Sequence, residues 1–184
     1  MDSLMIVGGI IVAALIMLAG MYNSHINRRN QVDLAFAAVD VQLKKRWDLV
    51  PNLVDTVKAY AAHEKETLTA VVAARTEAMR ADSDSQQRFN SEREIARLVP
   101  SLMAISESYP ELKANGQFLN LQRTLTEIEA QISAARRTYN SSIMEYNNGV
   151  QMFPSNIVAG AFGFQARQAL EIPHSERQVR NVSI

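Results

Sequence analysis

The chain has 184 residues, and its 19 basic side chains balance its 19 acidic ones, so its formal net charge is zero. A neutral chain lacks the strong positive field with which many proteins recruit nucleic acid. The absence of cysteine excludes disulfides, thiolate nucleophiles and cysteine-bound zinc or iron–sulfur centres. With only 7 glycines and 5 prolines and few alternating patterns, the composition favours an all-α fold of long helices.

An unbroken apolar run, LMIVGGIIVAALIMLAGMY, occupies residues 4–22. As a helix it spans roughly 28 Å, about the thickness of the hydrocarbon core of a bilayer. The preceding Met1-Asp2-Ser3 has no basic residue, unlike the start of a signal peptide. Met21 follows Leu18-Ala19-Gly20, where a lipoprotein would carry its acylated cysteine. We therefore expect a permanent transmembrane anchor over residues 1–22; a cleaved segment or a buried helix is the alternative.

The charges beside this run predict its orientation. Short flanks rich in Lys and Arg stay in the cytoplasm. The N-terminal flank carries only Asp2, whereas the basic residues after the run are Arg28, Arg29, Lys44, Lys45 and Arg46. This asymmetry predicts a short N-terminus outside and a cytoplasmic helical domain.

The next predicted helix continues from the anchor, because apolar residues recur at spacings of three and four from Val32 to Trp47. Two interpretations remain open at its end. In one, Asp48 is the N-cap of a second helix with Pro51 in its first turn. In the other, a single helix is kinked at Pro51. The chain then predicts a helix ending near Ala81.

A third predicted helix runs from about Gln86 to Ser108, bent at Pro100, and Pro110 opens the next element. The following helix is the clearest, about 35 residues long, and Pro154 ends it. Its apolar positions form a heptad seam with one stutter, as in coiled coils. They are Phe118, Leu121, Leu125, Ile128, Ile132, Ala135, Tyr139, Ile143, Tyr146, Val150 and Phe153.

These elements predict an anchor over residues 1–22, an antiparallel bundle of four long helices within 23–164, and a tail over 165–184. Residues 153–164, FPSNIVAGAFGF, form either a short helix that caps the bundle or a segment that inserts aromatic rings at the membrane surface. If Pro51 only kinks a continuous helix, this segment is expected far from the membrane. Residues 171–184 lack periodicity, so order there would require a neighbouring subunit.

Groups that carry chemistry are scarce. His63 and Glu64 are adjacent and lack the second histidine of a zinc-binding helix, so we expect no metal site there. Asp33, Asp40, Asp48 and Asp55 lie near one helix face, but the Glu-x-x-His motif of di-metal bundles is absent. We predict no catalytic, cofactor-binding or metal-binding residues and no enzymatic activity.

A family resemblance rests on three segments. The stretch VDVQLKKRWDLVPNLVDTVKAYAAHEKETLTAVVAAR at 39–75 resembles the signature of the LemA family, and SESYPELKAN at 106–115 and ARRTYNSSIMEYNNGVQMFPSN at 135–156 are similar to further family segments. Trp47 departs from the family pattern, and Met21 places the chain with the anchored members. The motif residues, of structural or interaction role, are Asp40, Gln42, Leu43, Arg46, Asp48, Pro51, Asn52, Leu53, Lys58, Tyr60, His63, Glu64, Tyr109, Pro110, Tyr139, Asn140, Tyr146, Asn147, Phe153 and Pro154.

The resemblance implies a single-pass protein of a bacterial membrane with an up-and-down helical domain and no enzymatic activity. It also implies links to magnetosome membrane formation, signalling or quality control among family members. Two functions follow as expectations. One is a membrane scaffold that forms homo-oligomers through its long amphipathic helices. The other is an adaptor or regulator of another membrane protein, such as a protease or sensor. If 48–51 is a partner site, substituting Asn52 or Arg46 should abolish assembly without unfolding the domain.

Overall fold

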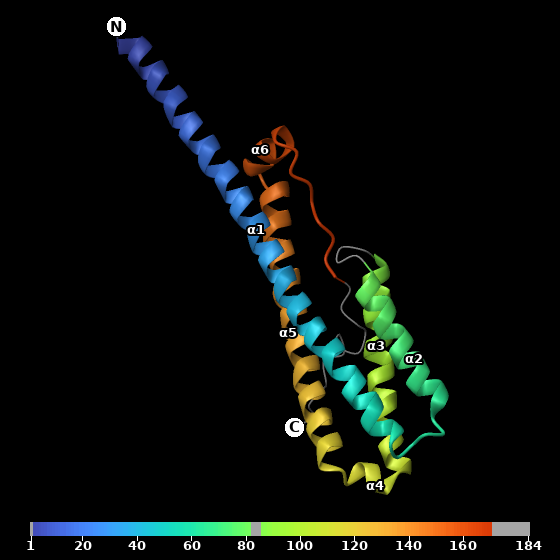
Figure 1. Cartoon of the computed structure of the whole chain (residues 1–184). Helices are drawn as coiled ribbons and strands as arrows, with labels where there is room; N and C mark the ends of the chain where they lie inside the picture. The colour runs from blue at the N-terminus through green and yellow to red at the C-terminus, as the bar shows by residue number, and fades with distance from the viewer. Residues whose placement is uncertain (1, 82–85, 171–184) are drawn as a thin grey trace, which may run out of the picture. The chain divides into compact units, whose positions relative to one another are not determined.

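The computed structural model describes residues 2–81 and 86–170, and throughout these residues the chain is helical, turn or extended, without strands (Figure 1). The predicted all-α class is confirmed. The predicted order of residues 171–184 lies outside the described residues. The elements are α1 Asp2–Lys58, α2 Lys65–Arg80, α3 Gln86–Ala104, the 3-10 turn η1 Ile105–Ser108, α4 Pro110–Lys113, α5 Gly116–Gln151 and α6 Ser155–Ala161.

α1 is one continuous helix of 57 residues with Pro51 inside it. The predicted helix start at Asp48 is therefore wrong, and the alternative of one helix through Pro51 holds. The chain turns later, over residues 59–64. Pro51 has no N–H to donate to the carbonyl of Trp47, four residues earlier. The side chain of Arg75 on α2 replaces this donor, with its Nε 2.7 Å from the Trp47 carbonyl oxygen.

The remaining boundaries agree with the sequence patterns. α2 ends at Arg80, and Pro100 lies inside α3 as expected. Pro110 occupies the first turn of α4, where its missing N–H is tolerated. α5 has 36 residues and ends at Gln151, three residues before Pro154.

The chain divides into two compact units. Unit 1 comprises residues 1–38 and 134–184, and unit 2 comprises residues 39–133. The predicted domain boundaries and the single antiparallel bundle of four long helices stay predictions.

The core of unit 2 draws apolar side chains from each of its long helical segments. α2 and α3 pack against each other. Fully buried residues come from α1, α2, α3 and α5; they include Val50, Leu53, Val57, Val71, Ile95, Leu102, Leu125 and Ile132. Such burial contributes about 1.5–3 kcal/mol for each large aliphatic side chain. The buried positions of α5 belong to the predicted heptad seam, so the seam packs inside the fold here.

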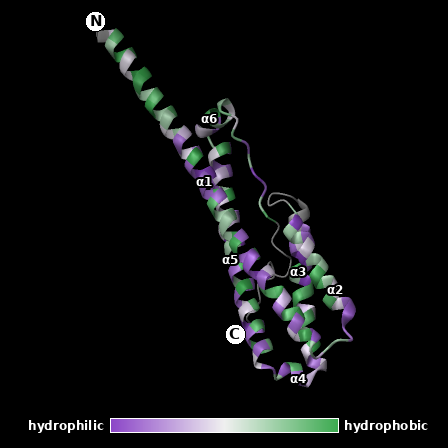
Figure 2. Ribbon diagram, viewed as in Figure 1, coloured by the Kyte–Doolittle hydropathy of each residue, from purple (hydrophilic) through white to green (hydrophobic). Residues whose placement is uncertain are grey.

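Unit 1 contains the apolar run, which appears as the continuous hydrophobic stretch of α1 in Figure 2. From Ser3 to Gly20 the side chains are exposed. Within the described residues, α1 alone is long and apolar enough to cross a membrane. Further along α1, Val32 and Ala35 are buried, as are Tyr139, Ile143 and Tyr146 of α5.

Candidate functional site

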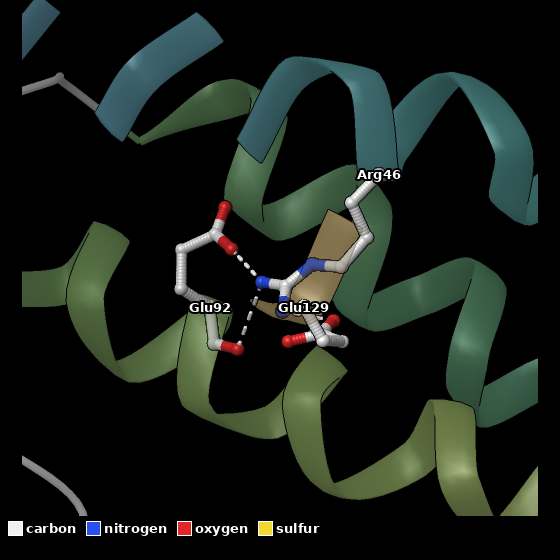
Figure 3. Close-up of polar contacts among 3 residues, drawn as sticks. All are labelled: Arg46, Glu92 and Glu129. Atoms are coloured by element: carbon white, nitrogen blue, oxygen red, sulfur yellow. Dashed lines mark hydrogen bonds and ion pairs between the residues drawn. The ribbon is translucent and has the colours of Figure 1, made fainter. Parts of the chain in front are cut away.

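A buried charge cluster lies in the middle of unit 2 (Figure 3). Arg46 on α1 is fully buried, and its Nη2 donates to both the carboxylate and the backbone carbonyl of Glu92 on α3. Its Nη1 donates to Oε1 of Glu129 on α5 at 2.8 Å, and Glu129 is 39% exposed. This cluster ties three helical segments together. Arg46 and Glu92 are closed to solvent, whereas Glu129 is partly exposed.

Two motif segments meet at one corner of unit 2. Asn115 caps the start of α5 by accepting the Phe118 N–H, and its amide donates to the Tyr60 hydroxyl at 3.0 Å. The Tyr109 hydroxyl donates to Glu64 at 3.4 Å. The turn after α1 is thus held by the segment around Pro110, which gives both motif segments a structural role.

Other residues of the 39–75 motif face solvent. The exposed ones are Asp48, Asn52, Lys58 and His63, whereas Leu43, Arg46 and Leu53 are buried. Asp40, Gln42, Pro51 and Glu64 are intermediate. Arg46 is buried in the fold, and the prediction that substituting Asn52 or Arg46 abolishes assembly stays a prediction. Asn52 remains accessible.

An aromatic cluster closes unit 1 where the apolar run ends. Tyr22 contacts Phe162 and Phe164, with ring centroids 4.9 and 5.8 Å apart. His25 is buried, stacks on Phe164 at 4.9 Å, and its Nε2 lies 3.1 Å from the Ser155 carbonyl oxygen. These contacts fix α6 against α1 just beyond the apolar run.

α5 and α1 approach closely beside this cluster. Arg28 donates from Nη1 to the Glu145 carbonyl at 3.2 Å and lies across α5 at Gly149. A Cβ added at Gly149 would stand 2.5 Å from that nitrogen. A side chain at this position would therefore require the Arg28 guanidinium to shift.

The exposed side of this region is apolar. Met152, Phe153, Ile157 and Phe162 are 61–80% exposed. Phe153 and Pro154 lie between α5 and α6, and the short helix expected in 153–164 is α6. For one helix continuous through Pro51, the sequence predicted that this segment lies far from the membrane. Phe162 instead contacts Tyr22 at the end of the apolar run.

In the two Tyr-Asn pairs of α5, the tyrosines and the asparagines make different contacts. Tyr139 and Tyr146 are buried, and Tyr139 packs on Phe36 at 5.6 Å. Asn140 and Asn147 instead bind the backbone of residues 165–170, which we call the strap. The Asn140 amide donates to the Leu170 carbonyl at 3.0 Å and its Oδ1 accepts the Leu170 N–H at 2.9 Å.

Asn147 repeats this pattern seven residues later. It donates to the Arg167 carbonyl at 2.8 Å and accepts the Arg167 N–H at 2.9 Å. Arg167 also pairs with Asp33 of α1 at 2.5 Å and lies over the Tyr146 ring at 5.7 Å. The hydrogen bond to Asp33 raises the pKa of Arg167 above its ordinary value.

The strap is the part of this site that the sequence patterns missed. Residues 165–170 fall in the predicted tail. The only local signal is the spacing of Asn140 and Asn147, which places both asparagines on one polar face of α5. Among the described residues, no three of His, Asp and Glu gather as metal ligands would.

Comparison with known proteins relates the chain to a LemA protein and to two magnetosome proteins. LemA of Metamycoplasma hominis is 24% identical over 168 residues, covering 88% of this chain and 77% of that protein. Two magnetosome proteins of Paramagnetospirillum magneticum, MamQ 1 and MamQ 2, are each 23% identical over 180 residues. The alignment covers 84% of this chain and 66% of either MamQ protein. The model of the LemA family matches residues 35–184, which is most of the sequence, and this chain therefore belongs to the LemA family.

Proposed function

We propose that this protein is a non-enzymatic, single-pass membrane protein whose helical domain assembles with further copies into a scaffold on the membrane surface. The observation that carries the proposal is the exposed apolar run of α1, which ends where α6 presents a second exposed apolar surface. The orientation proposed from Arg28 and Arg29 places the helical domain in the cytoplasm.

The aromatic cluster supports a membrane-surface position for α6. If the apolar run of α1 spans the bilayer, Tyr22 at its end lies at the interface, where tyrosine is enriched. Phe162 touches Tyr22, so α6 lies at the same depth. Phe153, Ile157 and Phe162 then bury their exposed surface among lipid headgroups, which favours binding by about 25 cal/mol per Å² of apolar area.

A depth measurement tests this position. Because the chain lacks cysteine, Ile157→Cys gives one site for an environment-sensitive fluorophore. In lipid vesicles we expect a blue-shifted emission that is quenched by lipids spin-labelled near the headgroup. Leu34→Cys is the matched control, being exposed and about 18 Å further along α1 from Tyr22. Equal, water-like emission from both sites would contradict the proposal.

The polar clusters favour a scaffold over an enzyme. Arg46, Glu92 and Glu129 bridge helical segments, and Tyr60, Glu64, Tyr109 and Asn115 hold a corner. The apolar seam of α5 is largely buried in the fold, so contacts between copies must use other surfaces. Anchoring confines copies to one plane, which raises their effective concentration and makes weak contacts sufficient.

Assembly is tested by the mass of the full chain in its lipid environment. We expect native mass spectrometry of protein in lipid nanodiscs, or native electrophoresis after mild extraction, to show oligomers that persist on dilution. A single copy at all concentrations would contradict self-assembly.

An adaptor function is the second candidate, favoured by the exposure of Asp48, Asn52 and Lys58 within the family motif. These three side chains face solvent, where a partner protein can reach them. In a crosslinked pull-down from native membranes, this function predicts a membrane protease or sensor that is lost with Asn52→Ala. Recovery of this chain alone would contradict it.

A further inference from the structure

Asn140 and Asn147 form a site that binds the backbone of an extended peptide, here the strap. Each asparagine side chain donates to the carbonyl and accepts from the N–H of one strap residue, and we call such a pair of hydrogen bonds a clamp. A neighbouring β-strand would offer the strap residue the same two hydrogen bonds. Neither clamp contacts a strap side chain through these bonds. Any extended segment without proline at the clamped positions satisfies them equally.

The spacing of the site is periodic on both sides. Asn140 and Asn147 are one heptad apart, which is about 10.5 Å along a helix. The clamped residues, Arg167 and Leu170, are three residues apart, which is about 9–10 Å in an extended chain. Within the strap, these two residues are half-buried and the four others are exposed. The half-buried residues of the strap are thus three positions apart, which matches the three residues per turn of a polyproline-II helix.

Side chains add selectivity for this segment. Arg167 reaches Asp33 and lies over Tyr146, so the site favours a basic residue at the position that Asn147 clamps. Residues 165–170 carry this arginine at the required distance from Leu170. A second copy of the chain presents the same six residues, with the same charge complementarity.

The strap is held by contacts that open easily. Its ion pair is exposed, and such pairs contribute little to stability. Four of its six residues face solvent. It joins α6 through residues 162–164, where Gly163 has a φ of +73° that favours glycine. Segments whose residues are mostly exposed open locally before the rest of a fold.

We propose that copies of this protein exchange straps, so that residues 165–170 of one copy occupy the Asn140–Asn147 clamp of its neighbour. This inference rests on the proposed self-assembly and names the contact that makes it. Exchange of an identical element is a low-cost route to oligomers because each contact already exists within one copy. Confinement to the membrane plane favours it further.

Crosslinking between singly substituted copies tests the exchange. One tagged copy carries Asp33→Cys and a differently tagged copy carries Arg167→Cys, both as full chains co-expressed in membranes. These side chains meet in the structure, and the chain has no other cysteine. With a short bis-maleimide we expect a dimer that carries both tags. Two Asp33→Cys copies provide the control and should give no such dimer.

Clamp variants separate strap exchange from simple proximity. Adding Asn140→Ala and Asn147→Ala to both copies should lower the dimer yield by roughly tenfold, because four hydrogen bonds are lost. Asn148→Ala is the matched control, being an exposed neighbour on the same helix, and should leave the yield unchanged.

Three outcomes overturn the proposal in distinguishable ways. Oligomers without the mixed dimer, together with an internal link in a chain that carries both cysteines, show that the strap stays in its own copy while self-assembly stands. Capture of another protein at Asp33→Cys assigns the clamp to a partner peptide. A single copy in nanodiscs overturns both strap exchange and the proposed scaffold.

Discussion

Replacing Arg46 with alanine lowers the free energy of unfolding by about 3–5 kcal/mol, the loss expected when one partner of a buried ion pair is removed. Arg46 is fully buried and Glu92 is 1% exposed, so the variant leaves the Glu92 carboxylate in the interior without its cation. Glu129 can turn its half-exposed side chain to water, so Glu92 carries most of the loss. Denaturant unfolding of the full chain in detergent, followed by circular dichroism, measures the change.

The chain supplies a matched control for this experiment. Arg97 and Glu94 form an ion pair one helical turn apart on α3, but both are exposed. Arg97→Ala should therefore leave the stability nearly unchanged. The double variant Arg46→Met with Glu92→Met removes both buried charges and should recover most of the loss. Equal effects of Arg46→Ala and Arg97→Ala would contradict the buried cluster.

Arg75→Ala destabilises the protein by about 1–3 kcal/mol, because it removes the donor that replaces the missing Pro51 N–H at the Trp47 carbonyl. The effect depends on the proline. In a Pro51→Ala background the backbone supplies its own N–H, so Arg75→Ala should lose little. A double-mutant cycle on the full chain measures this dependence as a coupling of about 1 kcal/mol or more.

A neighbouring residue controls for substitution on the same helix. Thr76 makes only a hydrogen bond to the Val72 carbonyl of its own helix, so Thr76→Ala should be nearly neutral in both backgrounds. If Arg75→Ala loses the same stability with and without Pro51, its role is side-chain packing and the interpretation of Pro51 fails.

Much of the helical order follows from the sequence because its signals are local. The seam of α5 is periodic over its whole length, and Pro110 marks a helix start. The course of α1 was ambiguous because Asp48 and Pro51 are equally suited to a helix start and to a helix interior. The Trp47 carbonyl, which Pro51 cannot serve, accepts a hydrogen bond from Arg75, a donor 28 residues away that no local pattern identifies.

The same limit applies to the candidate site. The Tyr-Asn pairs stand out in the sequence, and Tyr139 and Tyr146 are buried as their heptad positions predict. What Asn140 and Asn147 bind is not visible locally, because the strap lies 20 and 30 residues further on and has no periodicity that marks it. Similarly, the sequence shows Tyr60 and Asn115 as motif residues without showing that they meet.

The length of the strap matters more than the identity of its residues. Because the clamps grip N–H and C=O groups, the four solvent-facing positions accept most substitutions while the spacing between Arg167 and Leu170 must stay at three. One inserted or deleted residue between them releases a clamp, although each side chain is kept. Related chains can therefore diverge widely in this segment, provided that its length is unchanged and neither clamped position becomes proline.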